Sequence, residues 1–82
     1  MEFEKGDIVL SLAGRDKGKL LAVVRTESER VFLADGKERP LEKAKEKNPR
    51  HVQKTQFTVD GSSMETNRKL RKAIKQFTDF KR

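Results

Sequence analysis

Residues 5–24 of the chain, KGDIVLSLAGRDKGKLLAVV, decide the fold that the sequence predicts. In the first part, apolar side chains alternate with their neighbours at a period near two, which is typical of a half-buried strand over about residues 7–12. The side chains assigned to its buried face are Ile8, Leu10 and Leu12. The later segment LLAVV is a short apolar run and predicts a well-buried strand over about residues 19–26. The two strands predict a hairpin whose connection, AGRDKGK, is basic and rich in glycine.

Three further segments extend this hairpin. Residues 31–33, VFL, are a short apolar strand, and the following Asp35-Gly36 pair is a strong hairpin signal because both turn positions tolerate positive φ. A fourth strand is predicted over about residues 37–41, short or at a sheet edge because Pro40 cannot donate to a ladder. Residues 51–57 alternate weakly and can close a barrel. The predicted fold is therefore mostly β, a small SH3-like barrel of about five strands.

A basic amphipathic helix is predicted at the C-terminal end. Residues 1–57 form the predicted barrel and residues 58–63 a linker, after which the segment 64–82 follows, with its helix over about residues 64–78. Ser62 followed by Glu65 matches a capping box. The apolar residues at helical spacing are Leu70, Ala73, Ile74 and Phe77. Because an apolar stripe needs an apolar partner, which the barrel or another molecule can supply, this stripe is expected to pack on the barrel within a single domain.

The chain carries 20 basic and 13 acidic residues, a net charge of +7. The excess lies in the second half: residues 1–36 have a net charge of −1, residues 37–54 of +4 and residues 64–82 of +5. A chain charged in this way attracts an anionic partner.

Several classes of function are disfavoured by what the sequence lacks. There is no cysteine, so neither a disulfide framework nor a thiolate zinc site is expected. No apolar run approaches the roughly 18 residues of a membrane span, and the acidic start does not fit a signal peptide. A single histidine, with no nucleophile elbow and no phosphate-loop spacing, argues against an enzyme. We expect a cytoplasmic protein with no membrane partner, no cofactor, no metal and no catalytic activity.

The order of segments in this chain resembles the KOW motif of ribosomal proteins and transcription-elongation factors. The resemblance rests on G-D-I-V leading to K-G-K and an apolar strand, with R-P-L-E-K and K-N-P-R-H-V further on, and covers roughly residues 5–57. It is nearest to the small KOW-domain proteins of the archaeal and eukaryotic large ribosomal subunit. One departure is that Leu20 and Leu21 stand where many KOW motifs carry a second glycine. The resemblance implies an RNA-binding barrel whose loops contact ribosomal RNA.

Two basic loops and one helix face are the candidate RNA contacts. In the first loop, glycine lets the backbone approach a ligand and Arg15 offers a planar fork for phosphate. In the second, closely spaced like charges repel each other unless an anion neutralises them. The predicted RNA-binding residues are Gly14, Arg15, Lys17, Gly18, Lys19, Arg39, Lys43, Lys45, Lys47, Asn48, Arg50 and His51, with a secondary set of Arg68, Lys72 and Lys75. The alternative for each group is an ordinary solvated surface.

The predicted function is recognition of structured RNA by a ribosomal or ribosome-associated factor in translation or ribosome assembly. Five phenylalanines, with no tyrosine or tryptophan, leave little for base stacking and favour recognition of backbone and shape. We expect a monomer away from the RNA and the large ribosomal subunit as a partner. The alternative is an SH3-like protein-interaction module of the transcription or translation machinery, with the apolar stripe of the helix as a docking surface.

Overall fold

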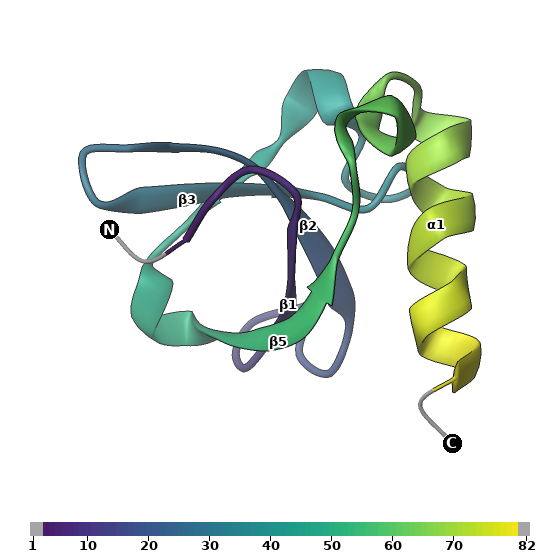
Figure 1. The fold of residues 1–82 in the computed structure, drawn as a ribbon. Helices are drawn as coiled ribbons and strands as arrows, with labels where there is room; N and C mark the ends of the chain where they lie inside the picture. The colour runs from purple at the N-terminus through teal and green to yellow at the C-terminus, as the bar shows by residue number, and fades with distance from the viewer. Residues whose placement is uncertain (1–2, 81–82) are drawn as a thin grey trace.

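One antiparallel sheet of five strands, with a helix packed beside it, forms the body of the protein (Figure 1). The computed structural model describes residues 3–80. The strands are β1 (Asp7–Ser11), β2 (Leu20–Glu27), β3 (Arg30–Ala34), β4 (Lys45–Lys47) and β5 (Val52–Thr58), and the helix is α1 (Asn67–Phe80). They lie in the order β4-β3-β2-β1-β5, and the sheet curls into a barrel-like shape. The predicted class, mostly β with a C-terminal helix, is confirmed.

Apolar clusters lie on both faces of the sheet, because successive residues of a strand point to opposite sides. The cluster inside the curled sheet contains Val9, Leu21, Val23, Val31, Leu33 and Val52. The cluster on the other face contains Ile8, Leu20, Ala22 and Ala34 and includes Met64, Leu70 and Ile74 from the C-terminal segment. The prediction that β1 is half-buried is therefore wrong, since α1 covers its second face. Leu12 follows the end of β1 and is 42% exposed, whereas LLAVV is a well-buried strand as predicted.

Helix α1 begins three residues later than predicted. Residues Gly61–Met64 form a 3-10 turn, η3, in which the side chain of Asp60 accepts the N–H of Ser63 at 3.0 Å. Thr66 then caps the helix, its Oγ1 accepting the N–H of Lys69 at 3.1 Å. The predicted capping box is wrong: the carboxylate of Glu65 pairs with the Lys69 ammonium at 3.1 Å. Residues 81 and 82 of the predicted C-terminal segment lie outside the described residues.

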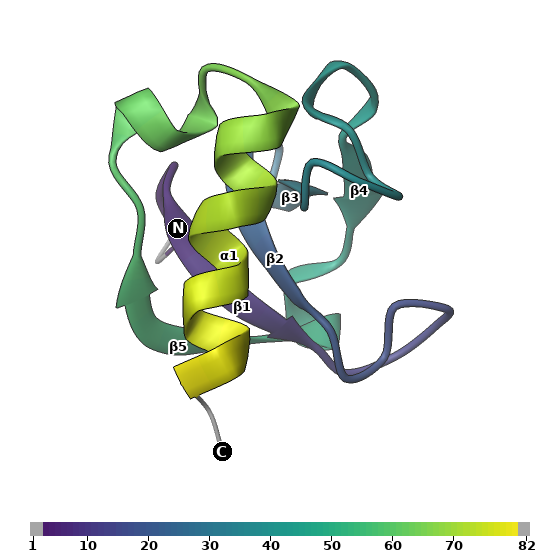
Figure 2. The ribbon, with the colours of Figure 1, turned by 90° about the vertical axis from the view of Figure 1, so that its right-hand side faces the viewer.

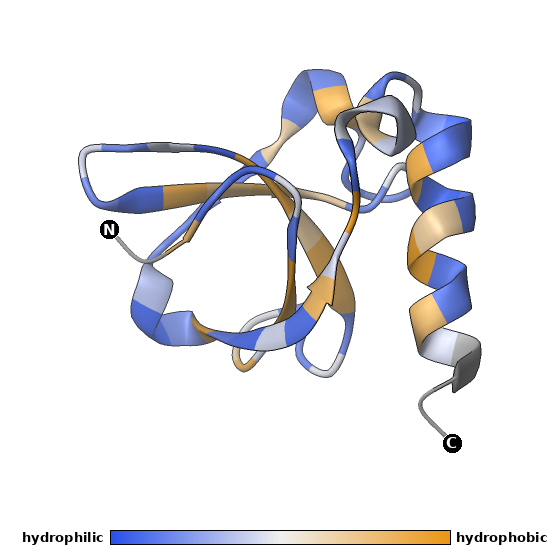
Figure 3. Cartoon of the chain, viewed as in Figure 1, coloured by the Kyte–Doolittle hydropathy of each residue, from blue (hydrophilic) through white to orange (hydrophobic). Residues whose placement is uncertain are grey.

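The apolar stripe of α1 faces the sheet (Figure 3). Leu70 is fully buried and Ile74 is 7% exposed. The ring of Phe77 stacks on that of Phe57 with 4.5 Å between centroids. The stripe of α1 thus packs against side chains of the sheet. Within residues 3–80, no helix has both the length and the apolar character needed to cross a lipid bilayer.

The fourth strand lies further along the chain than predicted. In residues 37–41 the backbone turns, because Asp35 Oδ1 accepts the N–H groups of Lys37 at 2.8 Å and Arg39 at 2.9 Å. A 3-10 turn, η1 (Leu41–Lys43), follows, and only then does β4 pair with the edge of β3. The basic segment predicted as a loop therefore contains an edge strand.

The turn around residues 35–39 supports the first turn of α1. Gly36 has φ +81°, and a Cβ atom there would collide with the carbonyl oxygen of Asn67 and lie 3.0 Å from the backbone nitrogen of Arg71. The Asn67 side chain accepts the N–H of Leu41 at 2.7 Å and donates to Glu42 at 3.0 Å. These contacts fix the position of α1 relative to residues 36–42.

Candidate nucleic-acid interface

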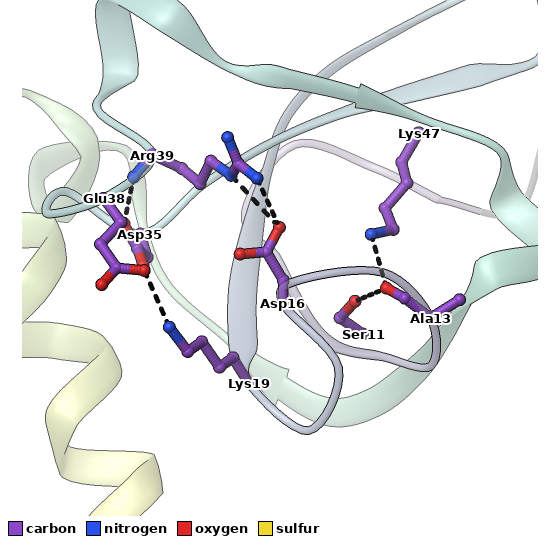
Figure 4. A network of polar contacts seen from close by, with 8 residues as sticks. All are labelled: Ser11, Ala13, Asp16, Lys19, Asp35, Glu38, Arg39 and Lys47. Carbon is purple, nitrogen blue, oxygen red and sulfur yellow. Dashed lines mark hydrogen bonds and ion pairs between the residues drawn. The ribbon is translucent and has the colours of Figure 1, made fainter.

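The β1–β2 loop, residues 12–19, is the centre of the candidate interface and is linked to the rest of the protein on two sides (Figure 4). On one side, Asp16, which is only 4% exposed, accepts the Nε–H of Arg39 at 3.2 Å and forms an ion pair with the same guanidinium. On the other side, Lys47 Nζ of β4 donates to the carbonyl oxygen of Ala13 at 2.9 Å. The loop is thus held between the 35–39 turn and β4.

A third link, between Lys19 and Glu38, lies at the exposed end of the loop. Lys19 Nζ and Glu38 Oε1 are 2.8 Å apart. The hydrogen bond from Lys19, reinforced by its charge, lowers the pKa of Glu38 from its ordinary value, and the same bond raises the pKa of Lys19. Both side chains are about half exposed, so water screens this pair and its contribution to stability is small.

A basic groove of about 820 Å³ separates this loop from α1. Figure 2 shows α1 facing the viewer with the β1–β2 loop projecting at its side. The charged side chains that line the groove are six cations and two carboxylates: Lys19, Lys37, Arg68, Arg71, Lys72, Lys75, Asp35 and Glu38. We call this the α1 groove. The four cations from α1 follow the spacing i, i+3, i+4 and i+7, which places them on one face of the helix.

Most of the positive charge in the α1 groove is uncompensated. Glu38 is paired with Lys19, and Asp35 accepts backbone N–H groups of its own turn. Among the side chains that the structure describes, none forms an ion pair with Lys37 or with any of the four α1 cations. The groove lining therefore has a net positive charge, and five of its cations have no ion-pair partner among the described side chains, which favours an anionic ligand.

A second hollow, of about 400 Å³, lies on the β4 side of the β1–β2 loop. Its lining residues are Ala13, Gly14, Arg30, Lys45, Glu46, Lys47, Asn48 and His51. We call this the β4 pocket. The short turn η2 (Pro49–His51) places His51 here, and Asn48 begins that turn by accepting the N–H of Arg50 at 2.9 Å.

Ten of the fifteen predicted RNA-binding residues line one of these two hollows. Gly18 and Lys19 line the α1 groove together with the whole secondary set, Arg68, Lys72 and Lys75. Five others line the β4 pocket: Gly14, Lys45, Lys47, Asn48 and His51. The structure thus brings the helix cations next to the first loop, although the sequence placed them on a separate, secondary surface.

Six predicted residues lie elsewhere or are engaged within the protein. Arg39 lies outside both hollows and pairs with buried Asp16, and Lys47 is 9% exposed and donates to a backbone carbonyl. The exposed cations that line neither hollow are Arg15, Lys17, Lys43 and Arg50.

Three lining cations were absent from the predicted set. Arg71 could have been included, because it lies three residues after Arg68 and so on the same helix face. Lys37 and Arg30 had no local signal, since their positions depend on how α1 and β4 pack against distant segments.

No protein-family model matches the sequence, and no curated protein is significantly similar to it. Function is therefore inferred from the chemistry of these surfaces.

Proposed function

We propose that the protein binds folded RNA through a continuous basic surface consisting of the α1 groove, the β1–β2 loop and the β4 pocket. The observation that carries this proposal is the set of five cations that line the α1 groove and form no ion pair with any side chain that the structure describes. Phosphodiester backbones provide closely spaced negative charges, and cations that neutralise them release bound counter-ions, which drives association. The KOW resemblance makes ribosomal RNA the expected target, in a cytoplasmic ribosomal or ribosome-associated factor.

The way in which the loop is held supports recognition by shape. Links from Arg39 and Lys47 fix both sides of the loop, so little backbone entropy remains to be lost when a ligand binds. The four phenylalanine rings that the structure describes are all partly buried, and two of them stack on each other. Few apolar rings are thus available to stack on bases, which favours contacts with the sugar-phosphate backbone.

The alternative of a protein-docking helix has less support. That hypothesis requires the apolar stripe of α1 to be accessible, whereas Leu70 and Ile74 are buried against the sheet. The accessible face of α1 is basic, and a partner that binds it must be anionic.

Fluorescence anisotropy with a labelled hairpin RNA tests the proposal. The double variant Arg68→Gln/Lys72→Gln removes two groove cations, and we expect its affinity to fall about tenfold or more, since charged contacts are stronger than neutral ones. The matched control Lys5→Gln/Arg25→Gln removes the same charge outside both hollows and is expected to bind nearly as well as the wild type. Equal losses of affinity in the two variants would contradict a localised RNA surface.

A further inference from the structure

Lys47 is a nearly buried cation that has no carboxylate partner within residues 3–78. It lies on β4 opposite Val31, and its side chain is directed toward the β1–β2 loop (Figure 4). Although the residue is only 9% exposed, the single acceptor that its ammonium contacts among the described residues is the carbonyl oxygen of Ala13. That carbonyl also accepts Ser11 Oγ at 3.1 Å, so its two lone pairs are shared between two donors.

The ammonium charge of Lys47 is only partly compensated by its contacts with the described residues. An ammonium group offers three N–H donors, and only one of those of Lys47 meets an acceptor among the described residues. Lysine is seldom buried to this degree without a charged partner, because taking a charge out of water costs free energy that one neutral acceptor only partly offsets. An anion in the β4 pocket would supply the missing charge and accept the remaining donors.

The surroundings of Lys47 suit an anion of several oxygens. Lys45, Arg30 and His51 line the same hollow and offer further N–H donors. The one carboxylate in the lining, Glu46, accepts Arg30 Nε at 3.1 Å, so it is already paired. The pocket therefore has a net positive lining around one inward-facing ammonium.

We propose that the β4 pocket is a phosphate-binding site with Lys47 at its centre. A phosphate group fits because it carries negative charge and presents several acceptor oxygens to the side-chain donors that line the pocket from β3, β4 and η2. The phosphate can come from the RNA backbone or from a terminal phosphate, and its assignment to RNA rests on the proposed function. In either case the pocket would fix where one phosphate lies relative to the β1–β2 loop.

Nuclear magnetic resonance of ¹⁵N-labelled full-length protein tests the site directly. The probes are inorganic phosphate and uridine 5′-monophosphate, with uridine as the uncharged control and sodium chloride used to keep ionic strength constant. We expect saturable shifts of the Gly14, Asn48 and His51 amides with both phosphate-bearing probes and none with uridine. Absence of saturable shifts with either phosphate-bearing probe would overturn the proposal.

Two variants separate binding from a purely structural role of Lys47. Lys47→Met should weaken phosphate binding at least about tenfold, whereas Lys43→Met, an equal loss of charge outside the pocket, should leave it unchanged. Because Lys47→Met removes a link to the loop, Lys45→Gln/His51→Gln provides a second test through exposed residues. This double variant should keep the wild-type melting temperature and still bind phosphate several-fold more weakly. Phosphate affinity that is unchanged in both pocket variants would overturn the proposal.

Short RNAs with and without a 5′-phosphate identify the source of the phosphate. Shifts of the same amides by 5′-hydroxyl RNA would support a backbone phosphodiester, and shifts only by 5′-phosphorylated RNA would support a terminal phosphate. RNA binding that leaves these amides unshifted would overturn the pocket, while RNA binding itself, through the α1 groove, would stand. Saturable phosphate shifts in a protein that binds no RNA would leave the pocket standing and overturn the proposed function.

Discussion

Gly36 and Gly18 both adopt positive φ, at +81° and +87°, but their surroundings differ. Gly36 lies beneath the first turn of α1, and an added Cβ would collide with the backbone of Asn67. Gly18 lies at the exposed end of the β1–β2 loop, with no atom within 4 Å of the position of an added Cβ. The first glycine is therefore required by both backbone conformation and packing, and the second by conformation alone.

This difference predicts unequal effects of the same substitution. Gly18→Ala should lower the free energy of unfolding by about 1 kcal/mol, the usual cost of a left-handed conformation for a residue with a Cβ. Gly36→Ala should lower it by about 2–4 kcal/mol, because α1 must also move. Urea denaturation of both variants measures these values. Equal losses of stability would mean that α1 does not rest on the 35–39 turn.

At the scale of elements, α1 is fixed by its apolar stripe. Ile74→Asp places a carboxylate among buried side chains, and we expect a loss of about 3–5 kcal/mol in the free energy of unfolding. Gln76→Asp introduces the same group on the exposed side of the helix and should change stability by less than about 1 kcal/mol. Thermal and urea denaturation compare the two variants. A wild-type melting temperature for Ile74→Asp would show that α1 is not held on the sheet in solution.

Local sequence patterns predicted where an element lies in the chain better than which distant segments pack against it. The apolar run of β2 and the stripe of α1 were readable because each depends on a few adjacent residues. The position of β4 was not, because Asp35 closes a turn through its own side chain where an edge strand was predicted. The burial of β1 on both faces was also missed, since it depends on a helix some sixty residues away in the chain.

The sequence indicated many of the residues of the candidate site, but it did not indicate how they lie relative to one another in space. The basic character of the loop and of the helix was visible in the sequence, yet their meeting in one groove follows from the packing of α1 on the 35–39 turn. The inward direction of Lys47 follows from its pairing opposite Val31, which no local pattern indicates. The ion pair between Arg39 and Asp16 joins segments that are distant in the chain, so no local pattern indicates it either.

At the scale of the whole molecule, stability should fall in acid. Hydrogen bonds lower the pKa of three carboxyl groups in the folded protein. Lys19 donates to Glu38, Asn67 donates to Glu42 and Ser62 donates to Asp60. A carboxyl whose pKa is lower when folded stabilises the protein above its unfolded pKa, and this stabilisation is lost as the pH falls through the folded value. We therefore expect the melting temperature to decline below about pH 4.

The variant Glu42→Gln tests one of these contributions. Its side chain no longer titrates, so its melting temperature should decline less steeply than that of the wild type between about pH 5 and pH 3. Glu29→Gln, in the exposed β2–β3 turn, removes a carboxylate with no such hydrogen bond to another described group and serves as the control. Identical acid profiles for wild type and Glu42→Gln would contradict the Asn67 bond in solution.

RNA affinity of the whole protein should depend steeply on salt. If roughly four to six phosphates are contacted, log K against log salt should have a slope of about −3 to −5. Arg68→Gln/Lys72→Gln should reduce the slope by about one unit for each phosphate that is no longer neutralised, and Lys5→Gln/Arg25→Gln should leave it unchanged. Anisotropy titrations from low to high potassium chloride measure the slope. A flat response would contradict an electrostatic interface.

The links on both sides of the β1–β2 loop have a geometric consequence. The same loop is one wall of the α1 groove and one wall of the β4 pocket, and its attachment to Arg39 and Lys47 keeps these two hollows at a constant separation. A ligand that occupies both must present phosphates at that separation. The protein would then select an RNA by the distance between two phosphates that its folding brings together, and not by the identity of its bases.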